Sequence, residues 1–182
     1  MRLTVALLPA LAMVVCTGAV AADPLFVINE IHADPDFLAG DANSDGQVNR
    51  AEDEFIEFVN VSGVVQDISS FTLSDTAAVR HEFAAETFLP AGCAVVVFGG
   101  GTPTGDFGGA LALTASSGSL GLNNSGEGVT LADAEGQPLA TESYGSLANN
   151  DQSITRDPDL TGTFVQHTTV NGGTGPLFSP CL

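Results

Sequence analysis

Hydrophobic residues in this chain fall into short runs that alternate with polar residues, the period of β-strands rather than of helices. Glycine, proline, asparagine and aspartate separate the runs, as they do where strands end in turns. The pattern predicts strands over residues 25–31, 54–61, 70–74, 81–83, 93–98, 110–114, 128–132, 138–144, 152–156 and 163–167. The last two are predicted as edge strands, and residues 133–137 as a hairpin turn with Gly136 at positive φ.

Many short strands without an amphipathic helix are typical of an all-β domain made of two packed sheets. We therefore expect a β-sandwich, with a small β-barrel as the alternative. The length of the chain fits one domain, which we place at residues 23–182.

The first 22 residues have the features of a secretory signal peptide. Met1-Arg2 is a short basic start, residues 3–16 are an apolar run, and Ala19-Val20-Ala21 resembles a cleavage site. Cys16 follows Val15 rather than a small residue, which argues against a lipoprotein. We expect cleavage after Ala21 or Ala22, with an uncleaved N-terminal anchor as the alternative. The expected location is secreted, periplasmic or at the cell surface, with no membrane span after cleavage.

Residues 41–52 match the twelve-residue calcium loop of EF-hands at every ligand position. The predicted Ca²⁺ ligands are Asp41, Asn43, Asp45, Gln47 through its backbone carbonyl, Asn49 and Glu52. Gly46 stands at the sixth position, where the chain must turn sharply. The alternative is a turn rich in aspartate, asparagine and glycine that holds no ion.

The predicted loop is followed almost at once by the strand at 54–61, so at most one helical turn fits between them. An EF-hand sensor needs two helices that reorient when calcium binds. The spacing therefore favours a structural ion held between the first two strands of the sandwich.

Two cysteines, Cys93 and Cys181, remain after removal of the signal peptide. In an oxidising compartment we expect them to form a disulfide. The alternative is two unrelated buried thiols.

The excess of acidic over basic residues limits the kinds of partner that the domain can bind. The chain has 22 acidic residues and no lysine, and only Arg50, Arg80 and Arg156 follow the signal peptide. Binding to nucleic acid needs clustered basic side chains that displace counterions, so we expect none by this domain itself.

Several motifs, taken in order, resemble the lamin-tail domain (LTD). The residues that carry this resemblance are 27–31 with Ala33-Asp34-Pro35, 53–60, 65–75, 88–92, 120–131 and 133–136. They extend over about residues 25–145. Phe71 stands where the family usually has tryptophan, and the calcium loop is an insertion similar to those in exported bacterial members and in dockerin repeats.

The resemblance implies an immunoglobulin-like β-sandwich with the calcium loop inserted between its first two strands. It also implies a domain that binds or scaffolds, often beside exported nucleases or phosphatases, and it carries over no catalytic residue.

The sequence offers little support for an enzyme. It lacks a G-x-S-x-G motif, and the glycine-rich stretch at 99–105 has no lysine after it, which indicates a flexible loop. His32, His81 and His167 are dispersed, without the spacing of a zinc site. Glu54 and Glu57 are possible acid–base residues, but they are more simply explained as carboxylates near the calcium loop.

We therefore expect a non-catalytic, calcium-stabilised binding or scaffolding module at or outside the cell envelope. Its partner is an unknown envelope or extracellular protein or a polysaccharide, and the loops at 99–109 and 145–151 are candidate recognition sites. The alternative is an accessory module of, or partner to, an exported nuclease or phosphatase.

Overall fold

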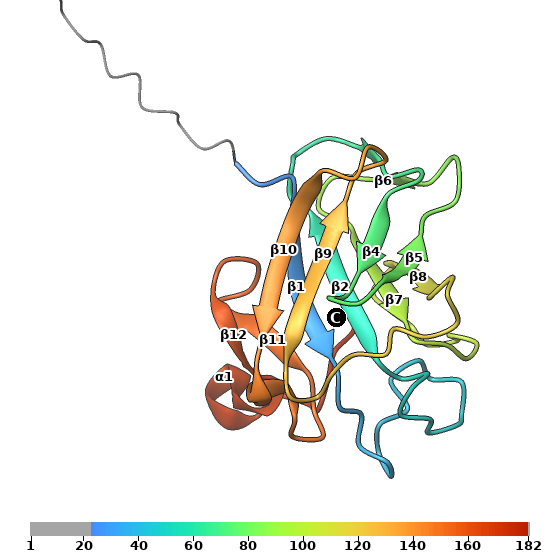
Figure 1. Ribbon diagram of the computed structural model, residues 1–182. Coiled ribbons are helices and arrows are strands. Elements are labelled where there is room, and N and C mark those ends of the chain that lie inside the picture. The colour runs from blue at the N-terminus through green and yellow to red at the C-terminus, as the bar shows by residue number, and fades with distance from the viewer. Residues whose placement is uncertain (1–22, 182) are drawn as a thin grey trace, which may run out of the picture.

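A computed structural model describes residues 23–181, which form two β-sheets packed face to face (Figure 1). The predicted signal peptide lies outside the described residues. The larger sheet has six strands in the order β12-β11-β1-β2-β7-β8. Their bounds are β1 Phe26–His32, β2 Phe55–Asn60, β7 Ala94–Phe98, β8 Leu111–Thr114, β11 Ile154–Asp157 and β12 Thr163–Gln166.

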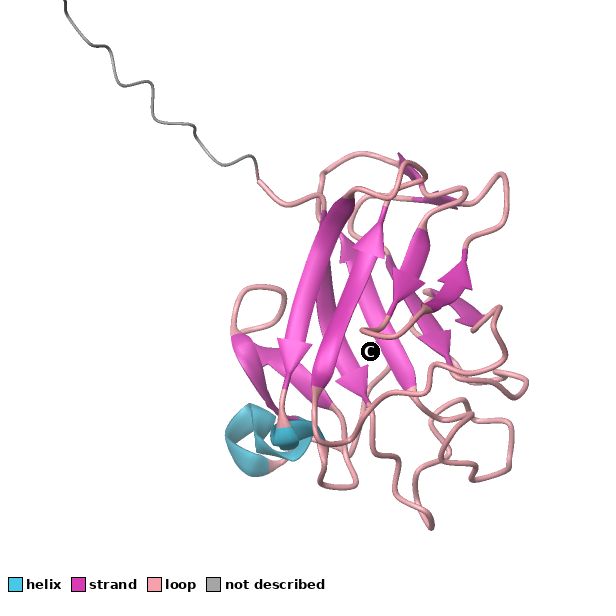
Figure 2. Ribbon diagram, viewed as in Figure 1, coloured by secondary structure: helices cyan, strands magenta, loops and turns pink. Residues whose placement is uncertain are grey.

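The second sheet has four strands in the order β10-β9-β4-β5, and a small ribbon pairs β3 with β6. The bounds are β3 Gln66–Asp67, β4 Thr72–Ser74, β5 Val79–Glu82, β6 Phe88–Leu89, β9 Glu127–Ala132 and β10 Pro138–Tyr144. The all-β, immunoglobulin-like sandwich is thus confirmed, and strands dominate Figure 2.

The main core lies between the two sheets. Phe26 and Ile28 of β1 and Phe58 of β2 pack there against Leu73 of β4 and Leu131 of β9. Phe26 meets Phe58 and Phe71 edge-on, with ring centroids 6.0 Å apart in each pair. Phe71 therefore occupies the core position that the family resemblance gave it.

A β-bulge in β1 changes which side chains face this core. Ile28 pairs with Phe58 but Glu30 pairs with Glu57, so Asn29 is the extra residue. Beyond the bulge Ile31 faces the core, while Glu30 and His32 turn to the outer face of the larger sheet. That outer face is buried as well, because Phe107 and Phe178 cover Phe55, Val96 and Phe98.

The predicted strands are present, but one expectation about their arrangement was wrong. β11 is not an edge strand, since it pairs with both β1 and β12. β8 runs parallel to β7, so the glycine-rich connection at 99–110 crosses from one end of the sheet to the other. A connection between parallel strands must return along the length of the sheet, and strand periodicity does not show it.

The pattern also missed several short elements of two to four residues. These are the β3–β6 ribbon, the 3₁₀-helices η1 (Ser146–Ala148) and η2 (His167–Thr169), and the four-residue α1 (Val170–Gly173). The predicted turn at 133–137 is confirmed, with Gly136 at φ 79°. Among residues 23–181, no helix is long and apolar enough to cross a membrane.

Candidate functional site

The predicted calcium loop lies in the connection between β1 and β2, at one end of the sandwich (Figure 1). Because β1 and β2 are antiparallel neighbours, the loop is an insertion into the first hairpin. The carbonyl of Asn49 accepts the N–H groups of Glu52, at 2.9 Å, and of Asp53, at 2.8 Å. These two bonds make a single helical turn before β2, as the spacing predicted.

Hydrogen bonds within the loop fold the first three predicted ligands inward. The Asp41 carboxylate accepts the N–H groups of Asp45 and Gly46, each at 3.1 Å. Asn43 Oδ1 accepts the same Asp45 N–H at 3.0 Å, and Asp45 Oδ1 accepts the N–H of Gln47 at 2.9 Å. Gly46 has φ 88°, a conformation that side chains disfavour.

Asp53, which the motif does not include, fixes the backbone of the loop. Its carboxylate is buried and accepts the N–H groups of Asn43 at 3.2 Å and of Asn49 at 2.8 Å. Burial raises the pKa of Asp53, and its hydrogen bonds oppose that rise. This carboxylate therefore joins the third and ninth positions of the loop. The sequence signal was an acid directly after the motif, in the resembling stretch at 53–60.

The other three predicted ligands are placed differently. Gln47 and Asn49 are exposed, and the half-buried Glu52 lies beside Gly100. Within residues 23–181, no group of three or more histidine, cysteine, aspartate and glutamate side chains is arranged to hold a metal. The carboxylates of Asp41, Asp45 and Glu52 are therefore not gathered around one point, and calcium binding stays a prediction.

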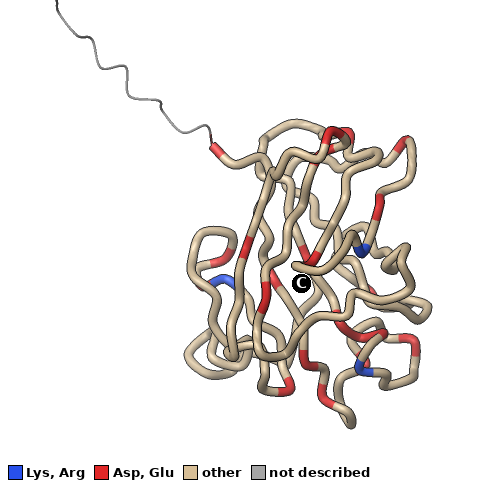
Figure 3. Tube along the Cα trace, in the orientation of Figure 1, with Lys and Arg blue, Asp and Glu red and all other residues tan. Residues whose placement is uncertain are grey.

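The negative charge of the loop has little local compensation. Arg50 is the one basic residue in the segment, and it forms an ion pair with Asp34 rather than with Asp41, Asp45 or Glu52. Figure 3 shows the same imbalance over the chain, with few blue positions among many red ones. A bound cation would relieve the repulsion between the three carboxylates.

The glycine-rich stretch, which its composition predicted as a flexible loop, packs against the rest of the fold where it begins. Its first residues lie against the calcium loop: Gly99 N–H donates to the Glu54 carbonyl at 2.7 Å, and Gly100 N–H to that of Glu52 at 3.1 Å. A Cβ on Gly99 would overlap the Ala51 carbonyl oxygen. Glycine is thus required here for close approach of two backbones, which composition alone does not distinguish from flexibility.

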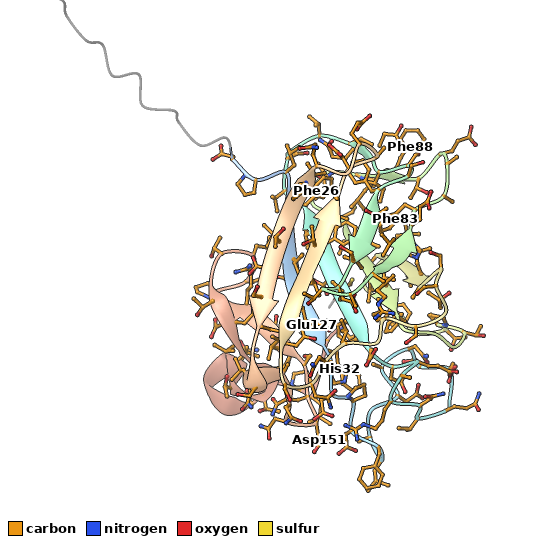
Figure 4. All side chains as sticks on the ribbon, viewed as in Figure 1. Phe26, His32, Phe83, Phe88, Glu127 and Asp151 are labelled. Atoms are coloured by element: carbon orange, nitrogen blue, oxygen red, sulfur yellow. The ribbon has the colours of Figure 1, made fainter. Side chains whose placement is uncertain are left out.

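Asp34 ties together three segments at the same end of the sandwich. It is buried and accepts hydrogen bonds from Arg50, from the Asn124 side chain and from the N–H of Asp151. Figure 4 places Asp151 below His32, the last residue of β1. The candidate recognition segment at 145–151 is therefore anchored beside the calcium loop.

A second polar cluster lies on the outer face of the larger sheet, beneath residues 176–181. Glu57 accepts the Asn29 amide at 2.9 Å and the Cys181 N–H at 2.6 Å. The neighbouring Glu30 accepts the Ser153 hydroxyl at 2.6 Å and the Ser179 N–H at 3.0 Å. The two carboxylates thus fasten the chain segment that covers them.

These two carboxyl groups lack a strong counterion. His167 Nε2 lies 3.6 Å from Glu30, but burial lowers the pKa of His167 and so favours its neutral form. Burial raises the pKa of Glu30 to about 7, and burial together with the charge of Glu30 raises that of Glu57 to about 7. Burial therefore favours the protonated form of both carboxyl groups.

Glu54 and Glu57 do not form a pair. Glu54 accepts the N–H of Leu122 at 3.1 Å, whereas Glu57 contacts Asn29 and Cys181. Burial raises the pKa of Glu54 to about 7 as well. The carboxylate that adjoins Glu57 is Glu30, which sequence reasoning missed because the bulge at Asn29 shifts the face on which it lies.

The two described cysteines are free in this structure, yet they line one pocket with Gly92, Ala94 and Ala110. Burial, and then the charge of Glu57, raise the pKa of the Cys181 thiol. The fold therefore brings residues 93 and 181 to the same place, and the disulfide stays a prediction.

The histidines do not form a shared site. His32 is fully buried between the rings of Phe55 and Phe178, with centroids 5.4 and 5.3 Å away, and burial lowers its pKa to about 3. His81, on β5, contacts the carbonyl of Thr114, on β8, through Nδ1 at 3.0 Å.

Comparisons with known proteins identify the class of this domain. Its two packed sheets define an immunoglobulin-like sandwich, the architecture of a scaffold rather than of one particular chemistry. The family model described as Lamin Tail Domain matches residues 20–146, and the chain belongs to that family. A search of curated proteins gives no match.

Proposed function

We propose that this protein is an exported, non-catalytic member of the lamin tail domain family that serves as a calcium-stabilised binding or scaffolding module. Membership of the family supports the sandwich as a binding or scaffolding domain. Export rests on the signal peptide features of residues 1–22. The partner we propose is a protein or polysaccharide of the cell envelope or its surroundings.

The geometry of residues 41–53 carries the calcium part of this proposal. Asp41, Asn43 and Asp45 already accept the backbone N–H groups that fold the loop, and Gly46 has the positive φ that the sixth position needs. Oxygen atoms of carboxylates, amides and carbonyls are the ligands that Ca²⁺ prefers. Binding would draw the carboxylate of Glu52 toward Asp41 and Asp45.

A structural role for the ion is supported by the position of the loop. Its exit turn leads directly into β2, which lies in the middle of the larger sheet. No second helix separates the loop from that strand. Calcium would therefore stiffen the entry to a central strand, without the helix movement of a sensor.

Native mass spectrometry tests calcium binding directly. After dialysis against Ca²⁺, we expect one bound ion in the wild-type chain and none in Asp41→Ala. Glu135→Ala, in the exposed hairpin turn, is the matched control and should keep the ion. A wild-type mass without calcium would refute the proposed site.

Cell fractionation tests the proposed export, and affinity capture tests the proposed binding to an envelope partner. The full-length protein should appear without residues 1–22 in the periplasm, on the surface or in the medium. Envelope material captured by the folded domain should contain a partner that a heat-unfolded sample does not retain. Retention of the intact chain in the cytoplasm would contradict the proposed export.

A further inference from the structure

The glycine-rich segment at 99–104 contacts the calcium loop along much of its length. Gly100 N–H donates to the Glu52 carbonyl in the exit turn, and Gly99 N–H donates to the carbonyl of Glu54, just before β2. Further along, Thr102 N–H donates to Asp45 Oδ2 at 3.2 Å, and Thr104 N–H donates to the Asn43 carbonyl at 3.1 Å. The side chain of Asn43 returns a bond, from Nδ2 to the Gly100 carbonyl at 3.3 Å.

Two of these contacts are made by the side chains of predicted calcium ligands. Asn43 and Asp45 stand at the third and fifth positions of the motif, where side-chain oxygens would bind the ion. Each of the two side chains also bonds to the 99–104 segment. The segment therefore restricts where these ligand side chains can lie.

Gly101 is the closest point of this contact. Its φ is 72°, and a Cβ added to it would lie 2.6 Å from Asp45 Oδ2 and still closer to Asn43 Nδ2. Such distances are too short for real Cβ contacts, so any side chain at this position would push the two ligands aside. Backbone strain and loss of space thus both require glycine here.

We propose that residues 99–104 form a second wall of the calcium site, that Gly101 is a positioning residue for it, and that calcium binding holds this segment in place. The inference rests on the proposed calcium binding and deepens it. Because the segment begins the crossover from β7 to β8, calcium would also control the order of the 99–109 loop, a candidate recognition site.

Titration with Ca²⁺ by calorimetry tests the role of Gly101. Gly101→Ala should weaken calcium binding by roughly tenfold or more, the effect of about 1.4 kcal/mol of lost ligand alignment. Gly109→Ala is the matched control, because Gly109 lies in the same loop at φ 85° and a Cβ there would have no neighbour within 4 Å. It bears similar backbone strain without touching a ligand, and should bind calcium about as tightly as wild type, within roughly threefold.

Hydrogen exchange in the wild-type chain provides a test that does not depend on a variant. On addition of Ca²⁺, exchange should slow at the N–H groups of Gly99, Gly100, Thr102 and Thr104 as well as within 41–53. The amides of the β9–β10 turn at 133–137 serve as the remote reference.

The outcomes separate the two proposals. If the wild-type chain binds no calcium, the proposed calcium site itself fails. If it binds calcium, but Gly101→Ala binds as tightly and protection stays within 41–53, the site stands and the second wall is refuted. Weakened binding in Gly101→Ala with protection extending over 99–104 supports it.

Discussion

Replacement of Glu57 by glutamine should destabilise the folded protein at acid pH and stabilise it at mildly alkaline pH. The pKa of Glu57 is raised from 4.5 to about 7 in the folded protein, first by burial and then by the charge of Glu30. A carboxyl group with a raised folded pKa contributes its full stability below the unfolded pKa and loses it as pH rises through the folded pKa. The relevant window is therefore from about pH 4.5 to about pH 7.

The size of the effect follows from the same two pKa values. Ionisation of Glu57 in the folded state costs about 3 kcal/mol, since each pH unit between them is worth about 1.4 kcal/mol. Glutamine resembles the protonated acid and does not ionise. It has one acceptor oxygen for two donors, the Asn29 amide and the Cys181 N–H, so one bond is lost at a cost of about 1 kcal/mol.

Glu57→Gln should consequently be about 1 kcal/mol less stable than wild type near pH 4, below the unfolded pKa, and about 2 kcal/mol more stable near pH 8. Urea unfolding at both pH values measures these differences. Other buried groups also make stability depend on pH in this range: Glu30 and Glu54 in the same direction, and His32 in the opposite one, because its folded pKa of about 3 lies below its ordinary value of 6.5. Comparison of variant and wild type at each pH removes the contributions that both share.

Glu82→Gln, at an exposed position of β5, is the control and should follow wild type at both pH values. Equal destabilisation of Glu57→Gln at acid and alkaline pH would refute the reasoning, because it would show that Glu57 is charged throughout the window.

Two further predictions concern other contacts. Asp34→Ala should lower the unfolding free energy by about 2–4 kcal/mol in urea titrations. The reason is that the donors of Arg50, Asn124 and Asp151 lose their buried acceptor. A loss of under about 0.5 kcal/mol would contradict this prediction. Protein purified from an oxidising compartment should contain a disulfide between Cys93 and Cys181, seen as the absence of free thiols in the non-reduced intact mass. Two alkylated thiols there would show that no bond forms.

The fold could largely be predicted from the sequence because short apolar runs separated by glycine, proline, asparagine and aspartate mark most of its strands. The burial of β2 and of most of β7 does not alternate, since both faces of the larger sheet are covered there, although residues 54–61 and 93–98 were predicted as strands. The parallel pairing of β7 and β8 could not be predicted, because it depends on where the 99–110 connection runs and not on either strand.

The candidate site was predicted only in part for a similar reason. The motif located residues 41–52 through local spacing. The contacts of Asp53 are local but lie outside the motif, whereas those of Gly101 depend on packing between segments far apart in the chain. The acidic pair of Glu30 and Glu57 depends on one extra residue, Asn29, which decides the face on which Glu30 lies. Local patterns do not carry such information.

The central claim is that calcium stabilises this sandwich through the 41–52 loop, and thermal unfolding with and without a chelator tests it most directly. A ligand at about one hundred times its dissociation constant stabilises by about 2.7 kcal/mol, which for a domain of this size raises Tm by roughly 5–10 °C. We predict a shift of that order between Ca²⁺ and excess chelator in the wild-type chain, and none in Asp41→Ala. An identical Tm of the wild-type chain in both conditions would contradict the account.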